Sequence, residues 1–443
     1  MAKKTRPELY AKILANLPDN TTELITPAKD REVEDAEVES CFNLQDDEAT
    51  DVNYTPTTSA DWLPEGAPTE VGEGLDILAA RTGVNLSQDI AYVSNVTTAG
   101  ITPELGNPLK PFATIKAAFT ACPPSNFTVK VLGGSYTLTA LDDPIAINKT
   151  NFVLDLKGCL LDATASANGL FFQGCTNGYV LLEGGKITGR VNLGGGSTVK
   201  MSLIGGEVTG NKINLGKNAY LVNCRVIVGT AVEESALTSE NISSNSERPV
   251  ISNCYLESDA TANFPTSSAI AVYNNCFIKG AINVISLSSS STVYSQFNNC
   301  NIIGQGETGF RTVVGNAATT RCNGIFNNCH IESTVGYAIW MGSTTNTCFF
   351  NNCNIISEID CVLIQSSISR GATNRTTFNK CSFYLKNPLT SEIFVEQGYS
   401  SDSGKTQLIG TTVFNKAFTT SDVARFEVIG DQLTVTDAQI PVL

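Results

Sequence analysis

The chain has 443 residues, of which 42% are hydrophobic and 16% are charged, and its formal net charge is −14. The hydrophobic share is enough for a core, while the acidic balance argues against a duplex-DNA partner, which needs a basic footprint. No apolar run reaches the length of about 18 residues that a bilayer span requires. One histidine, His330, argues against His-rich zinc sites and His-dependent catalytic triads.

The acidity is concentrated in the N-terminal fifth of the chain. Residues 1–90 contain 7 Lys/Arg and 19 Asp/Glu, a net charge of −12, whereas the remaining 353 residues contain 22 and 24, a net charge of −2. This change in composition predicts a domain boundary near residue 90. We expect residues 1–50 to be a helical leader that anchors the protein and residues 51–90 to be an acidic linker.

Two short helices are predicted within the leader. The first, from Pro7 to Leu17, has apolar residues at helical spacing, and the second begins at Thr26-Pro27 and ends near Phe42. Such helices bury little surface alone, so we expect them to dock on a partner; a loosely packed leader is the alternative. The residues expected to form the anchor are Leu9, Ile13, Leu14, Leu17, Val33 and Phe42.

A short repeat runs through the body of the chain. The dipeptide Asn-Cys recurs six times, and a seventh copy reads Lys380-Cys381; the steps between cysteines are 30, 22, 24, 29, 24 and 28 residues. The repeated cysteines are Cys224, Cys254, Cys276, Cys300, Cys329, Cys353 and Cys381. The asparagines that precede them are Asn223, Asn253, Asn275, Asn299, Asn328 and Asn352.

Alignment of the seven copies on the cysteine gives a period of two. The residue three before it is always large and apolar, as in Phe297, Phe326, Phe350 and Phe378, and the residue two after it is also apolar. The residue between is mixed, so it faces outward, and the pattern predicts a strand. The asparagine falls at a corner, where it tolerates the left-handed region.

The same register continues upstream. Gly206, Gly185 and Cys159 take the place of the cysteine, and Leu203, Leu182 and Leu156 stand three residues before them. About ten rungs of 18 to 30 residues between positions 150 and 385 predict a parallel β-helix, with stacked columns of Cys, aromatic and Asn side chains. A β-sandwich with fortuitous Asn-Cys pairs is the alternative.

A solenoid needs a cap, and the segment before the repeat predicts one. Residues 106–119 read GNPLKPFATIKAAF, a turn and an amphipathic helix, and residues 129–136 read VKVLGGSY, a strand and a turn. These residues resemble the start of right-handed, pectate-lyase-like β-helix domains. Such domains occur in secreted polysaccharide enzymes and in tailspikes and fibres of tailed bacteriophages. The resemblance covers residues 91–385 and implies a capped right-handed parallel β-helix, but no particular activity.

The leader carries a second resemblance. Residues 17–40 read LPDNTTELITPAKDREVEDAEVES and are similar to leaders of virion proteins in tailed phages, including crAss-like phages. A leader, a linker and a capped β-helix are the layout of a virion appendage, so we expect residues 1–50 to dock on a capsid or tail protein. The resemblance to phage β-helices implies a homotrimer. Met1 to Arg6 are not followed by an apolar segment, so no secretory signal is expected, and assembly in the host bacterial cytoplasm fits.

The cysteines and the outward acids are the residues of the body that could bind a metal, form disulfides or catalyse glycan cleavage. No CxxC motif is present, so we expect the cysteines to pack in the core; disulfides and a metal site are the alternatives. His330 falls at an outward position and is expected to be a surface polar residue. Glu257 and Glu332, three residues after their cysteines, are three rungs apart, about 14 Å, which is too far for a glycosidase pair. Glu332, Glu358 and Asp360 remain as weak catalytic candidates.

These observations favour an all-β, structural phage appendage, a head or tail fibre or spike located in the virion. We expect no cofactor, no metal, no nucleic acid and no membrane span. Two alternatives stay open on the same fold: a polysaccharide depolymerase, which would cluster outward acids, and a glycan-binding module, which would present outward aromatics. Outward Tyr255 and Phe277 favour host-glycan binding or a subunit contact. Residues 386–443 are expected to form a distal β-element, a trimer tip or glycan-binding end.

Overall fold

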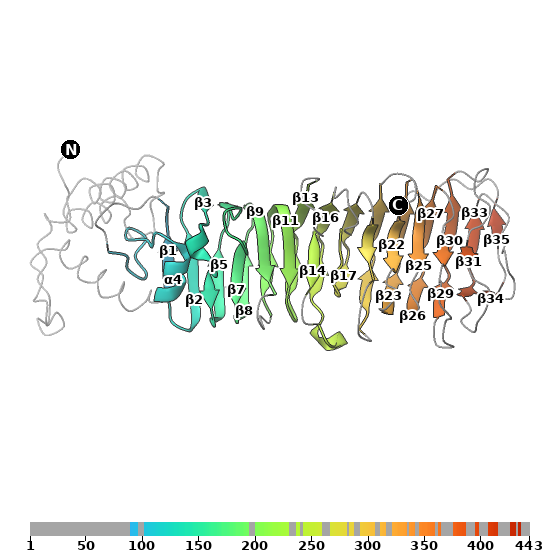
Figure 1. The fold of residues 1–443 in the computed structure, drawn as a ribbon, viewed down its shortest axis with the longest axis horizontal. Coiled ribbons are helices and arrows are strands. Elements are labelled where there is room, and N and C mark those ends of the chain that lie inside the picture. Colours follow the sequence, from blue (N-terminus) through green and yellow to red (C-terminus); the bar gives the residue numbers. More distant parts are fainter. Residues whose placement is uncertain are drawn as a thin grey trace, which may run out of the picture. The chain divides into compact units, whose positions relative to one another are not determined.

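The computed structural model contains a parallel β-helix within the unit Gln88–Leu443 (Figure 1). The residues that the structure describes are 89–95, 102–194, 200–229, 236–239, 242–258, 266–280, 283–287, 293–305, 311–315, 321–334, 336–341, 345–358, 362–364, 375–386, 395–397, 406–414, 426–430 and 433–435. The expected anchor residues, and the linker up to Gln88, lie outside them.

The first sheet has 14 strands, and each pairs in parallel with the next. In sheet order its strands are β1 (Ile90–Val93), β2 (Ser125–Val131), β5 (Thr150–Asp155), β8 (Thr176–Leu181), β10 (Ser202–Ile204), β12 (Tyr220–Val222), β15 (Val250–Ser252), β17 (Val272–Asn274), β20 (Ser295–Asn298), β23 (Arg321–Asn327), β26 (Thr345–Asn351), β29 (Arg375–Asn379), β32 (Thr406–Ile409) and β34 (Phe426–Ile429).

The second sheet has 16 strands, and its main path follows the first sheet strand for strand. That path is β3 (Ser135–Thr137), β6 (Leu160–Asp162), β9 (Lys186–Leu193), β11 (Glu207–Leu215), β13 (Arg225–Val228), β16 (Tyr255–Ser258), β18 (Phe277–Gly280), β21 (Asn301–Gly304), β24 (His330–Ser333), β27 (Asn354–Ser357), β30 (Ser382–Leu385), β33 (Thr412–Phe414) and β35 (Leu433–Val435). The strands beside it are β4 (Ala146–Ile147), β7 (Leu170–Gln173) and β14 (Leu237–Ser239).

A third sheet of five strands forms in the C-terminal half. It consists of β19 (Asn283–Ser286), β22 (Arg311–Gly315), β25 (Tyr337–Met341), β28 (Val362–Ile364) and β31 (Val395–Gln397). The bridges from Leu237 to Ser267 and from Ser267 to Ile285 connect β14 to β19. The third sheet therefore continues a line of pairing that starts beside β11. The right hand of the coil, which the resemblance of residues 91–385 implies, stays a prediction.

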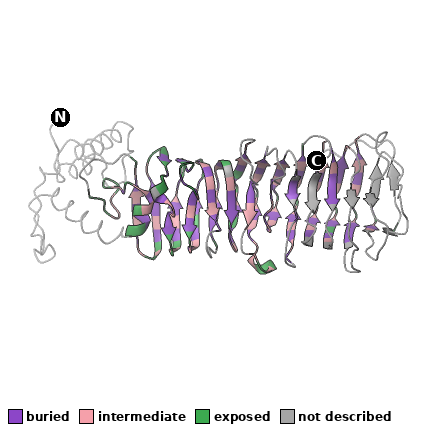
Figure 2. Cartoon of the chain, in the orientation of Figure 1, coloured by how far each residue is buried: buried purple, intermediate pink, exposed green. Residues whose placement is uncertain are grey.

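The predicted register of the seven repeats is confirmed by the strand pairing. Arg225 pairs with Tyr255, Tyr255 with Phe277, and the series continues to Ser382. The cysteine and the residue two after it are buried in every repeat, while the residue between them is partly or fully exposed. Figure 2 shows this alternation of buried and half-buried residues along both long sheets.

The aromatic residues form one column inside the first sheet. The rings of Tyr273, Phe297, Phe326, Phe350 and Phe378 stack face to face, with centroids 4.4 to 4.8 Å apart and planes within 12° of parallel. All five side chains are fully buried. The parallel strands set this spacing, since strand neighbours lie about 4.8 Å apart.

The upstream register differs from the prediction at one corner. Leu203 pairs with Val180, and Val180 with Leu154, so Leu182 and Leu156 do not belong to the column. The corners before Cys159 and Gly185 contain two more residues than the later ones, which moves the column two positions along the strand. The shorter corner at Gly206 is tight, since a Cβ added to Gly206 would lie only 2.4 Å from the carbonyl oxygen of Leu182.

The Asn corner is a left-handed residue repeated on successive rungs. Asn223, Asn253, Asn275, Asn299, Asn328 and Asn352 all have φ of 53° or 54°. Asparagine adopts this region more readily than most residues. From Asn275 to Asn352, each side-chain amide donates to the Oδ1 of the Asn on the preceding rung at 3.3 Å. A second amide ladder, which the sequence analysis did not assign, links Asn274, Asn298, Asn327, Asn351 and Asn379.

The predicted cap helix is present as α4 (Ile115–Ala121), at the N-terminal end of the solenoid (Figure 1). Thr114 caps it by accepting a hydrogen bond from the backbone N–H of Ala117. Phe119 projects into the first rungs, where its ring meets those of Phe127, Phe152 and Phe172 edge to face. Two 3₁₀ turns, Ala140–Asp142 and Asn245–Glu247, are the other helical segments described.

The strands described beyond residue 386 extend the existing sheets. β32 pairs with β29, and β33 with β30, both in parallel. The C-terminal residues are therefore β-structured in continuity with the helix and do not form a sheet of their own in the part described. Their role as a tip stays a prediction.

Candidate functional site

The outward acids lie on the second sheet, at the third position after each cysteine. Glu257 pairs with Lys279, Lys279 with Ile303, and Ile303 with Glu332. Three strand spacings therefore separate the two glutamates, about 14 Å. The expectation that they are too distant to act as a glycosidase pair follows from this register.

Glu257 belongs to a charge network on β11, β13, β16 and β18. Its carboxylate accepts hydrogen bonds from Lys279 Nζ at 2.7 Å and from the Tyr255 hydroxyl at 2.8 Å. Arg225 on the neighbouring strand is paired with Glu207 at 3.0 Å. The hydrogen bond from Lys279 lowers the pKa of Glu257, so this side chain is a carboxylate at neutral pH.

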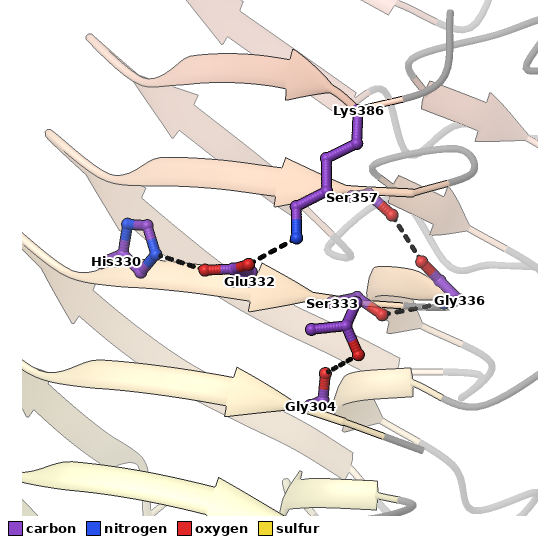
Figure 3. A network of polar contacts seen from close by, with 8 residues as sticks. Gly304, His330, Glu332, Ser333, Gly336, Ser357 and Lys386 are labelled. Atoms are coloured by element: carbon purple, nitrogen blue, oxygen red, sulfur yellow. Dashed lines mark hydrogen bonds and ion pairs between the residues drawn. The ribbon is translucent and has the colours of Figure 1, made fainter. Parts of the chain in front are cut away.

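Glu332 is held between two basic side chains (Figure 3). Its Oε2 lies 3.1 Å from His330 Nε2, two residues earlier on β24, and its Oε1 accepts from Lys386 Nζ at 2.5 Å. The hydrogen bond with His330 is the main cause that lowers the pKa of Glu332 to about 2, and Lys386 adds to it against the cost of burial. A group with this pKa is ionised at neutral pH and is a poor general acid.

Lys386 was not among the predicted site residues, although it organises this cluster. It follows β30, and its backbone N–H donates to the carbonyl oxygen of Ser357 on β27. Its side chain reaches Glu332 on β24, so the ion pair crosses the strand that carries Ile356 (Figure 3). Ile356 is only 2% exposed despite its outward position. Position five after the cysteine, shared by Thr334, Glu358 and Lys386, was the signal available in the sequence.

His330 points outward, as predicted, but it is not an exposed surface residue. Its side chain is 10% exposed, and Glu332 occupies its Nε2. Figure 3 also shows the turn after β24, where Ser333 accepts from the Gly336 N–H and Ser357 donates to the Gly336 carbonyl. His330 itself lies between Asn301 and Asn354 on the two neighbouring strands, so its burial comes with the side chains of the adjacent rungs.

The remaining catalytic candidates are only partly placed. Glu358 directly follows β27 and is half-buried, one strand away from Lys386 in the same column. Asp360 lies outside the described residues. Among the residues described, no group of three or more His, Cys, Asp or Glu side chains is arranged to hold a metal ion.

Tyr255 and Phe277 stack on each other on the outer face. Their centroids are 5.1 Å apart, their planes are 2° from parallel, and the Arg225 guanidinium lies over Tyr255 at 5.4 Å. Phe277 covers one face of the tyrosine ring and Arg225 the other. A sugar stacks on a free ring face, so Tyr255 offers less to a glycan than its outward position suggested.

The cysteine column is a row of buried thiols, and the eleven cysteines whose side chains the structure describes form no disulfide among themselves. Each repeat thiol donates to the carbonyl two residues earlier, as in Cys254 to Ser252 at 3.2 Å. Hydrogen bonding to Cys224, together with burial, raises the pKa of Cys254, and burial raises that of Cys159. Protonated thiols are poor metal ligands, so the core-packing interpretation fits.

The helix that the structure describes is too short to cross a membrane. The chain matches no protein-family model and no curated protein.

Proposed function

We propose that the protein is a structural subunit of a virion appendage, a fibre or spike on the head or tail of a tailed bacteriophage. Residues 1–50 attach it to a capsid or tail protein, and the β-helix projects as a homotrimer that contacts host surface glycans. The phage assignment and the trimer rest on the sequence resemblances of residues 17–40 and 91–385.

The observation that supports a structural role is the state of the outward glutamates. Glu257 and Glu332 are each ion-paired with a lysine, and both have a lowered pKa. A glycosidase needs one carboxyl group with a raised pKa to protonate the leaving group, and a partner carboxylate at about 5–9.5 Å. Instead, Glu257 ties two neighbouring rungs together and Glu332 ties two rungs that lie two strand spacings apart, and such ties suit a rigid shaft.

The alternative, a tailspike-type depolymerase, would use Glu332 with Glu358 and Asp360. The test is incubation of the full chain with purified host surface polysaccharide, followed by assay of reducing ends and unsaturated sugars. We expect no release. Release that is lost in Glu358→Gln or Asp360→Asn, but kept in the exposed control Glu183→Gln, would establish the depolymerase instead.

The location is tested by imaging virions that carry a label fused to the C-terminus of this chain. We expect the label on a projecting fibre or spike. Label confined to the infected cell, with none on purified virions, would refute the appendage assignment.

A further inference from the structure

Two exposed tyrosines lie on the outer face of the first sheet, one on β8 and one on β12. Tyr179 and Tyr220 are 40% and 45% exposed, and both pair with Ser202 on β10, the strand between them. Two strand spacings, about 10 Å, therefore separate the two tyrosines. Among the residues described, neither ring stacks on another aromatic ring, so both differ from Tyr255, whose ring is covered.

The surface between the tyrosines is short and mostly apolar. Ser202 is small and buried, and the other paired outward positions of the three strands are half-buried aliphatic residues. These residues are Leu181, Ile204 and Val222. The C–H groups of a pyranose ring pack on the face of an aromatic ring while the sugar hydroxyls stay in water. Two uncovered tyrosine rings on such a surface therefore suit a sugar.

A lysine without a partner stands at the edge of this surface. Asn177, Lys200 and Asn218 lie two residues before Tyr179, Ser202 and Tyr220, and have left-handed φ of 52°, 56° and 53°. Lys200 is exposed, and its ammonium group has no ion pair or hydrogen bond with any other described residue. Glu247, whose carbonyl oxygen accepts from the Asn218 N–H, has its carboxylate paired with Lys217 at 3.0 Å. The charge of Lys200 is therefore available to an anion.

Negative charge lies at the opposite end of the same strands. Asp155 pairs with Leu181 at the C-terminal end of β8, and Glu183 follows two residues later. These carboxylates repel an anion from that end, whereas Lys200 attracts one at the other end. The distribution of charge therefore orients an acidic sugar, with its carboxylate at Lys200 and its ring over the tyrosines.

We propose that Tyr179, Lys200 and Tyr220 form a binding site for a hexuronate residue of a host surface polysaccharide. The pyranose ring packs on the tyrosines, and the sugar carboxylate pairs with Lys200. An exposed ion pair and one or two ring contacts give weak binding, with a Kd of about 1 mM for one site. The proposal rests on the glycan contact of the proposed function, and it gives that contact a location and a class of sugar.

The experiment measures binding of a defined hexasaccharide to the full chain by ligand-observed NMR titration. The probe alternates glucuronate and N-acetylglucosamine. The same hexasaccharide with its carboxyl groups reduced to alcohols is the matched ligand, because it keeps the rings and loses the charge. We expect the acidic form to bind about threefold or more tightly than the reduced form, and this preference should shrink as salt rises.

The matched variants are two lysines in the same backbone conformation. Lys200→Asn removes the charge and introduces the residue that occupies the neighbouring left-handed corners, so the fold should be kept. Lys380→Asn is the control, because Lys380 is also exposed and has φ of 53°. Lys200→Asn should lose the preference for the acidic form, whereas Lys380→Asn should keep it.

The tyrosines are tested together. The double variant Tyr179→Ala, Tyr220→Ala should weaken binding of both hexasaccharides by about threefold or more, because the ring contact does not depend on charge. Far-UV circular dichroism and thermal unfolding show whether each variant keeps the fold.

Three results would overturn the site. They are a wild-type chain that binds neither hexasaccharide or both equally, folded variants at Lys200 and the tyrosines that bind as the wild type does, and an equal loss in Lys380→Asn. Cleavage of the hexasaccharide during the titration would instead remove the structural role and leave the site. A chain that is found on virions and binds neither form would lose the site and keep its role as an appendage.

Discussion

Two adjacent phenylalanines on β26 allow the contribution of a core side chain to stability to be compared with that of a surface side chain. Phe350 lies in the stacked column and is fully buried, while Phe349, the preceding residue on the same strand, points outward and is 36% exposed. The two positions have the same residue type and the same strand neighbours. Their difference is therefore burial and ring stacking.

Phe350→Ala should lower the free energy of unfolding by about 3–5 kcal/mol, because it leaves a cavity between two rings. The same loss is expected for Phe326→Ala. Phe349→Ala is the control and should cost no more than about 1 kcal/mol. Denaturant titration followed by circular dichroism measures both, and equal effects at positions 349 and 350 would contradict the register.

Glu332 should make the stability of the protein depend on acid pH. Its pKa is about 2 in the folded chain and near 4.5 when unperturbed, so ionised Glu332 stabilises the fold above pH 4.5. That contribution is lost as pH falls from about 4.5 towards 2. Glu332→Gln should cost about 1–3 kcal/mol at pH 7 and flatten this part of the pH profile.

The control for this prediction is Glu183→Gln. Glu183 pairs with Lys157, but both side chains are about half exposed, so the change should alter stability by less than about 0.5 kcal/mol. Thermal unfolding between pH 2 and pH 8 checks both variants. A Glu332→Gln profile that is parallel to the wild type would show that the His330–Glu332–Lys386 cluster does not stabilise the fold.

At the scale of the element, the Asn corner joins the two long sheets on each repeat. The left-handed backbone at this corner excludes most residues, and the amide ladder then links neighbouring corners. Lys380 occupies the same backbone conformation at the last repeat, with φ of 53°, so the conformation does not depend on asparagine alone. The flanking strands impose the left-handed corner, and asparagine lowers the conformational free energy that this corner costs.

Two substitutions at Asn328 separate backbone strain from the ladder. Both Asn328→Gly and Asn328→Ala remove the side-chain hydrogen bonds to Asn299 and Asn352, but only glycine fits φ of 53° without strain. Asn328→Ala should therefore be less stable than Asn328→Gly by about 1 kcal/mol. Urea midpoints measure the difference, and equal or reversed stabilities would assign the role of Asn328 to its amide.

At the scale of the whole molecule, the β-helix is self-contained. Its described strands pair only with one another, from β1 at residue 90 to β35 at residue 435. The acidic N-terminal segment has a different composition, with most of the net charge of the chain. We therefore expect the β-helix to fold without the N-terminal segment that is proposed to attach it.

Deletion of residues 1–50 should leave a soluble, folded β-helix that no longer joins the virion. The acidic leader should dock on a positively charged surface, so attachment of the full chain should weaken as salt rises. Circular dichroism tests the fold of the deleted chain, and immunoblotting of purified virions tests its incorporation. Normal incorporation of the truncated chain would refute the anchoring role of residues 1–50.

The sequence by itself determined the parallel β-helix, its cap and the inward columns. A period of two around each cysteine and an irregular spacing between cysteines leave few folds in which Phe297, Phe326 and Phe350 can stack. Strand geometry makes inward and outward residues alternate, and this alternation becomes visible when the repeats are aligned. The error at Leu182 shows the limit, because a corner two residues longer keeps the same hydrophobic pattern.

Only the tertiary structure decided the surroundings of the outward residues. Glu332 contacts Lys386, 54 residues later in the chain, because the fold places their strands only two positions apart in the second sheet. His330 is covered and Tyr255 is stacked for a related reason: on an outer face, burial depends on the side chains that neighbouring rungs present. The pattern of one strand contains no information about its neighbours two rungs away, and that is where the charges of this site are fixed.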